Sequence, residues 1–141
     1  MSRESRRVAG ILLIILPTVM YGGLSILWLL VGDKQYAANH LRQDLWRAGH
    51  AHAGVLLVLA LIWLRYVDEV ALSAGLKSFV RLAIPGAAIL MPTGFFLCVL
   101  RASATEPNSM IYFVYIGAGL LALGVLVLGV GLVRAPRVST A

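Results

Sequence analysis

The chain has 141 residues, of which 60% are hydrophobic and 13% are charged, and its mean hydropathy is +0.90. Soluble domains are about half apolar and about a quarter charged. The composition therefore excludes a disordered chain and an ordinary cytosolic enzyme, and the single cysteine, Cys98, excludes an internal disulfide framework. The net charge of +6 comes mostly from basic residues beside apolar runs, which indicates membrane topology and no nucleic-acid partner.

Four apolar runs predict four membrane-spanning helices. In chain order they cover approximately residues 8–31, 46–64, 79–100 and 110–133. Each run is close to the roughly 20 residues that a helix needs to cross a bilayer. Apolar and polar residues do not alternate along them, which excludes the strands of a membrane barrel. We therefore predict an all-α membrane protein, a four-transmembrane-helix bundle with short loops that forms a single integral membrane domain over residues 1–141.

The first run also has features of a signal peptide, because basic residues precede it. Its apolar stretch is too long for a signal peptide, however, and no A-x-A-like cleavage site follows it. We therefore interpret it as a retained span.

Lysine and arginine residues flank the four runs unevenly. The N-terminus, the second loop and the C-terminus carry eight of them, including Arg134 and Arg137, and the other two loops carry four. The positive-inside rule then predicts a multi-pass protein of a bacterial-type plasma (inner) membrane with both termini in the cytoplasm. In the second loop, Asp68 and Glu69 lie near Arg65 and are expected to be solvated.

All three histidines of the chain lie on the predicted outer side, at or before the start of the second span. His40 precedes the span, and His50 and His52 lie within it. Ionisable residues at membrane depth are costly and are often functional. Residues i and i+2 of an α-helix point about 200° apart, so His50 and His52 cannot share a face or bind one metal ion together.

The residues alone leave three interpretations of these histidines open. In the first, His50 or His52 ligates haem iron, copper or zinc, with partners among His40, Met91 and Met110. In the second, the histidines form a polar vestibule that binds a substrate or relays protons. In the third, the rings lie in interfacial water or among lipid headgroups. The other residues of the predicted vestibule are Asp44, Arg47 and Glu106.

The segment 47–57 reads Arg-Ala-Gly-His-Ala-His-Ala-Gly-Val-Leu-Leu. A His-x-His near a helix start, followed by small residues and leucines, resembles helices of haem-copper oxidase and nitric-oxide-reductase-type membrane proteins. The resemblance covers about a dozen residues and implies a haem or copper ligand at His50 or His52. Those oxidases have many more spans and further ligand histidines. The whole chain is therefore more similar to a small uncharacterised bacterial four-span membrane protein.

Glycines and prolines in the last two runs bear on helix packing. Gly117, Gly124 and Gly131 recur every seven residues and favour a close helix contact, either within the bundle or between copies of the chain. Pro85 and Pro92 are also seven residues apart, which predicts tolerated kinks, a hinge, or a cavity that exposes backbone acceptors.

The sequence favours a binding or accessory membrane protein with a histidine-containing site for a metal, haem or a small molecule. The alternatives are an oligomeric transporter or channel for small solutes, an enzyme that uses a bound metal, and a structural subunit of a larger membrane complex. The expected partners are the lipid bilayer and either further copies of the chain or a larger complex. The sequence does not decide whether the protein is an enzyme.

Overall fold

The computed structural model describes residues 1–134, and Arg137 lies outside these residues. The described part contains helices and no strands: α1 (Arg3–Gly32), α2 (Lys34–Ala38), α3 (His40–Glu69), α4 (Ala74–Leu97), the short 3₁₀ helix η1 (Ser109–Ile111) and α5 (Tyr112–Arg134). Four helical segments, α1, α3, α4 and η1 with α5, are long and apolar enough to cross a membrane. The predicted all-α class with four candidate spans is confirmed.

Polar side chains set where the helices begin. An oxygen of each capping side chain accepts a hydrogen bond from a free N–H group in the first turn. The helices α1, α2, α3 and α4 are capped in this way by Ser2, Asp33, Asn39 and Ser73, respectively. Because Asn39 caps α3, that helix begins six residues before the predicted start of the second span at residue 46. Its first turns therefore include residues 40–45, four of which are polar.

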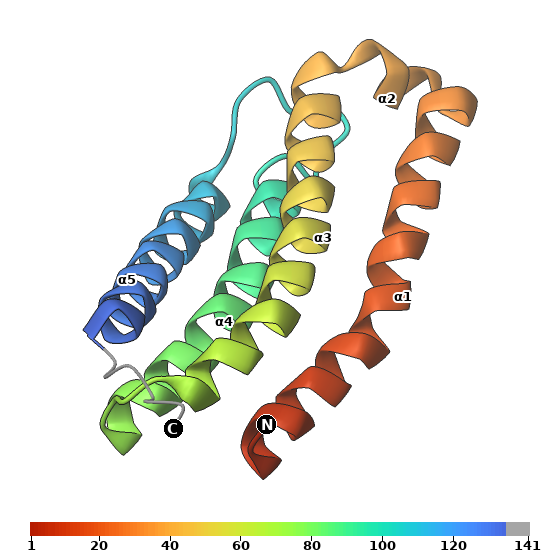
Figure 1. The fold of residues 1–141 in the computed structure, drawn as a ribbon. Helices are drawn as coiled ribbons and strands as arrows, with labels where there is room; N and C mark the ends of the chain where they lie inside the picture. The colour runs from red at the N-terminus through yellow and green to blue at the C-terminus, as the bar shows by residue number, and fades with distance from the viewer. Residues whose placement is uncertain (135–141) are drawn as a thin grey trace.

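The four long helices lie side by side in a row. α1 packs on α3, α3 packs on α4, and α4 packs on α5, so that α1 and α5 form the two edges (Figure 1). In the most apolar window of each helix, half of the α4 residues but only 6% of the α1 residues are buried. α3 and α4 therefore supply most of the core, and α1 covers one side of α3.

The two ends of this row differ in which segments they contain. We call the end with residues 1–7, residues 70–73 and Arg134 the terminal face, and the end with α2 and residues 98–111 the loop face (Figure 1). Positive-inside counting predicts that the terminal face is cytoplasmic.

The evenly spaced glycines of α5 allow close contacts with other segments of the same chain. A Cβ atom added at any of the three would come closer to a neighbouring side chain than real Cβ atoms do. The nearest atoms would be Met91 Cγ at 2.6 Å from Gly117, Ala83 Cβ at 2.7 Å from Gly124, and Val70 Cγ2 at 2.6 Å from Gly131. These contacts confirm the bundle-packing interpretation of the seven-residue spacing. α4 also continues through both of its prolines as one helix.

A cluster of charged side chains joins three helices at the terminal face. The side chain of Arg81 in α4 is only 10% exposed and forms ion pairs with Glu4 of α1 and with Asp68 of α3, whose Oδ1 lies 3.4 Å from an Arg81 nitrogen. The buried hydroxyl of Ser5 donates to Asp68 at 2.9 Å and accepts from Arg81 Nε at 3.1 Å. The backbone N–H of Ser2 also donates to Asp68, at 2.6 Å. The expectation that Asp68 is solvated is therefore wrong, because three segments enclose its carboxylate.

Candidate functional site

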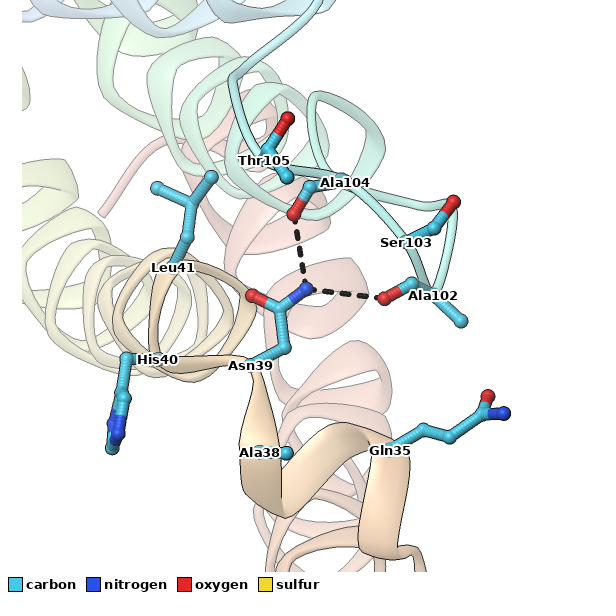
Figure 2. Close-up of a pocket in the computed structure, with 9 residues that line it drawn as sticks. All are labelled: Gln35, Ala38, Asn39, His40, Leu41, Ala102, Ser103, Ala104 and Thr105. Atoms are coloured by element: carbon cyan, nitrogen blue, oxygen red, sulfur yellow. Dashed lines mark hydrogen bonds between the residues drawn. The ribbon is translucent and has the colours of Figure 1, made fainter.

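The structure separates the three histidines. His40 is the first residue of α3 and is exposed. A hollow of about 670 Å³ lies between this helix start and residues 102–105. Figure 2 shows that His40 points away from residues 102–105, whereas Asn39 points toward them and donates to the carbonyls of Ala102 and Ala104 at 3.1 and 3.0 Å. This hollow is therefore bridged by a structural amide and is not organised around His40.

The predicted vestibule residues do not bond to His40 in the described part of the chain. Asp44 and Arg47 pair with each other at 3.0 Å, and both side chains are more than half exposed. Glu106 is exposed and lines a separate hollow in the connection before α5. A shared vestibule of these residues stays a prediction.

His52 lies on the side of α3 that faces α4. Its Nδ1 is 2.7 Å from the carbonyl oxygen of Ala48, one turn earlier in the same helix. Its ring packs against Phe95 of α4, with the ring centres 5.1 Å apart. The Nδ1–H tautomer donates to that carbonyl and leaves Nε2 as the acceptor. One ring nitrogen and one ring face of His52 are thus used in packing.

His50 lies on the other side of α3 and faces α1. A Cβ atom at Gly23 would lie 2.8 Å from His50 Nε2, and one at Gly22 would lie 3.8 Å from Nδ1. His50 is half-buried, and no hydrogen bond joins its ring to any residue among 1–134. A side chain at position 23 would therefore require the imidazole to move. The predicted separation of His50 and His52 onto different helix faces is confirmed.

A hollow of about 250 Å³ lies beside His50 between α1, α3 and α4. Most of its lining is apolar, and its polar groups come from all three helices. Pro92 has no N–H group and cannot donate to the carbonyl of Ala88 one turn earlier. The hydroxyl of Thr93 has no hydrogen-bond partner among residues 1–134, and that of Thr18 donates to its own helix. We call this hollow the His50 pocket; it is lined by Thr18, Val19, Gly22, His50, Ala53, Ala88, Ile89, Pro92, Thr93 and Phe96.

Residues 1–134 contain no group of three or more His, Cys, Asp or Glu side chains placed to hold a metal ion. Of the proposed sulfur partners, Met91 is buried near Gly117 of α5, and Met110 lies in η1 at the loop face. Neither contributes to the lining of the His50 pocket. The structure gives no support to metal or haem binding at the histidines.

Sequence reasoning missed a second polar cluster at the loop face. Arg42 is buried, and its Nε donates to the carbonyl of Val99 at 3.1 Å, just beyond the end of α4. Its guanidinium lies over the ring of Trp46 at 4.6 Å, and Trp46 Nε1 donates to the carbonyl of Phe96 at 3.2 Å. A cation is favourable at a helix C-terminus, where carbonyl groups are unpaired. The i, i+4 spacing of Arg42 and Trp46 was the available signal.

Comparison with protein-family models, with curated proteins and with solved structures finds no significant match. The resemblance of segment 47–57 to haem-copper oxidase helices therefore stays a prediction.

Proposed function

We propose that the protein is a small membrane binding protein and that the His50 pocket holds a small ligand with a hydrogen-bonding group. One observation carries this proposal: the His50 imidazole lies between α1 and α3 with no hydrogen-bond partner in the described part of the chain. A polar group without a partner is expensive in an apolar environment, and intramembrane ionisable residues are usually functional.

The chemistry of the pocket indicates what such a ligand would offer. A neutral imidazole has one donor and one acceptor nitrogen. The Thr93 hydroxyl can do both, and the Ala88 carbonyl that Pro92 leaves free can only accept. These groups suit a ligand with a hydroxyl, carbonyl or amide function. The side chains of Val19, Ile89 and Phe96 then suit an apolar body.

The size of the pocket favours a small polar function over a macrocycle. Sites for drug-sized ligands commonly have volumes of roughly 300–1,000 Å³. At about 250 Å³ the His50 pocket lies below that range, whereas haem is larger than most drug-sized molecules. A small amphiphile whose polar end reaches His50 from the bilayer fits these dimensions.

A transporter or channel would need more than the helices described here. α1 and α5 lie at opposite edges of the row, so a closed pathway would have to be completed by further copies or by another subunit (Figure 1). The binding function has no such requirement, because its pocket is formed by three helices of one chain.

The first test is to identify what the purified protein carries. The full chain is purified in mild detergent, and its organic extract is compared by mass spectrometry with extracts of His50→Leu and His40→Leu. We expect a compound that co-purifies with wild type and with His40→Leu but is depleted at least about tenfold in His50→Leu, the loss expected when about 1.4 kcal/mol of binding free energy is removed. His40 is the matched control because it is exposed and points away from residues 102–105.

Two further measurements make this test decisive. Gly22→Leu should deplete the same compound, because its side chain would enter the pocket beside His50. A visible spectrum and elemental analysis of the same samples address haem and metals. Identical extracts from wild type, His50→Leu and Gly22→Leu would overturn the proposal. A haem band or a stoichiometric metal that is lost only in His50→Leu would replace the small molecule with that cofactor.

A further inference from the structure

A second hollow lies at the terminal face, far along the chain from His50. It has a volume of about 410 Å³ and lies between α5 and the residues that connect α3 to α4. Its lining is apolar except for Arg134 in the last turn of α5. Its complete lining is Ala71, Leu72, Leu76, Leu126, Val127, Val130, Gly131 and Arg134.

The floor of this hollow depends on a glycine. A Cβ atom at Gly131 would lie 2.6 Å from Val70 Cγ2 and 3.1 Å from Leu72 Cδ2. The 70–73 connection therefore lies directly on the backbone of α5. An adjoining apolar hollow of about 390 Å³ is lined by α5 alone and shares Leu126 and Val130 with the first. We call the two hollows together the groove.

Among residues 1–134, the terminal face carries more unpaired cations than carboxylates. Three carboxylates lie at the terminal face, and each is paired with an arginine: Glu4 and Asp68 with Arg81, and Glu69 with Arg65. Five other cations of this face form no ion pair with any residue among 1–134, namely Arg3, Arg6, Arg7, Lys77 and Arg134. Of these five, Arg134 lies at the groove itself.

We infer that this groove binds one anionic phospholipid, with an acyl chain along Leu126 and Val130 and the phosphate group at Arg134. An apolar groove that ends in a cation at the edge of a spanning helix matches a lipid in both polarity and charge. Basic residues at the membrane surface attract anionic lipids, and each is worth about fivefold in affinity. The other unpaired cations of the terminal face add to that attraction, and the groove fixes the position of the lipid.

Native mass spectrometry of the full chain in detergent tests this site. The probes are phosphatidylglycerol and phosphatidylcholine, added separately at equal concentrations. Wild type should retain phosphatidylglycerol preferentially, and Arg134→Gln should reduce that preference about fivefold. Arg134→Lys should keep most of it. Arg101→Gln is the matched control, because Arg101 is an exposed cation of the loop face.

Three outcomes would overturn the inference. The first is equal retention of the two lipids by wild type. The second is an equal effect of Arg134→Gln and Arg101→Gln. The third concerns Val130→Trp, which fills the groove from a position that is 47% exposed and therefore outside the core. If Val130→Trp keeps the wild-type preference while Arg134→Gln loses it, the attraction belongs to the charged surface and not to a groove site.

Discussion

Arg81 and His50 are both polar residues on helices that pack together, but they differ in whether neighbouring residues bond to them. Arg81 has partners from two neighbouring helices, and every group in its cluster is bonded to another. His50 has an open hollow beside it and no hydrogen-bond partner among residues 1–134. A satisfied cluster fixes helices in place. In the proposed function, a bound ligand would supply the hydrogen-bond partner that His50 lacks.

The loop face supports the same distinction. Arg42 is buried like Arg81 but forms no ion pair with a carboxylate among residues 1–134, and it bonds instead to backbone carbonyls beyond the end of α4. A buried arginine therefore lies at each face of the bundle, Arg81 at the terminal face and Arg42 at the loop face. The His50 pocket lies between these two faces. Four predictions test this division between structural and binding groups.

The largest effect is expected at the terminal face. Arg81→Leu leaves the carboxylate of Asp68, which is only 15% exposed, without its cation. Removing one partner of a buried ion pair destabilises a protein by roughly 3–5 kcal/mol. We expect a loss near 3 kcal/mol, because Glu4 remains 72% exposed and can be solvated. The measurement is thermal unfolding of the purified protein in detergent.

Arg65→Leu provides the control for this prediction. Its ion pair with Glu69 is about half exposed on both sides, so its loss should cost less than about 1 kcal/mol. If the two arginine variants unfold at the same temperature, the Arg81 cluster does not hold the helices together. The double variant Arg81→Leu with Asp68→Leu should recover part of the loss, since no charge then stays buried.

The next effect is expected at the loop face. Arg42→Met removes a charged donor from the carbonyls of Val99 and Leu100, and hydrogen bonds that involve charged groups contribute about 1.5–3 kcal/mol. Arg42→Lys keeps the charge but loses the planar group above Trp46, so it should restore stability only in part. Arg47→Met is the matched control, because its pair with Asp44 is exposed. Equal stability of Arg42→Met and Arg47→Met would remove the argument for an arginine cap.

The two arginine clusters also show where sequence reasoning reaches its limit. The four spans were predictable because hydropathy is a local property that accumulates along each run. The opposite directions of His50 and His52 followed from helical periodicity alone. By contrast, Arg42 bonds to a residue 57 positions later, and Arg81 to one 77 positions earlier. Contacts of that kind depend on which helices become neighbours, and no local pattern encodes them.

The His50 pocket was unpredictable for the same reason, because residues far apart in the sequence form it. His50 was a candidate because it is polar and lies in an apolar run, but its surroundings come from Gly22 and Gly23 in one helix and from Pro92 in another. The sequence of the first run shows Gly22 and Gly23 but does not show which helix lies against them. Their importance became visible only when α1 was seen to approach the imidazole.

The third prediction separates binding from stability at the two half-buried histidines, His50 and His52. His50→Leu removes a group without a protein partner, so the free energy of unfolding of the empty protein should change by less than about 1 kcal/mol. His52→Leu loses the hydrogen bond to Ala48 and should destabilise by about 1 kcal/mol or more. Thermal unfolding after exhaustive detergent washing measures both. A larger loss in His50→Leu than in His52→Leu would assign His50 to packing.

The smallest effect is expected at Tyr36, which tests whether an unpartnered polar group always implies a ligand. Tyr36 in α2 is fully buried between Arg42 and Trp46, and its hydroxyl has no hydrogen-bond partner in the described structure. Tyr36 lines neither of the two hollows described at the loop face, so we expect no ligand there. Tyr36→Phe should therefore be neutral or stabilise the protein by up to about 1 kcal/mol, because it removes a desolvated group.

The pH dependence of stability gives a second comparison between wild type and Tyr36→Phe. Burial raises the pKa of the Tyr36 hydroxyl above its ordinary value of 10.0, and nearby Arg47 and Arg42 only partly oppose the shift. A raised pKa favours the neutral hydroxyl in the folded state, so the unfolded chain releases this proton first as the pH rises. The contribution of this hydroxyl to the free energy of unfolding is therefore highest below pH 10 and falls as the pH rises above 10. Raising the pH from 8 to 11 should therefore lower the unfolding temperature of wild type more than that of Tyr36→Phe. An equal decrease in the two proteins would mean that the hydroxyl is solvated.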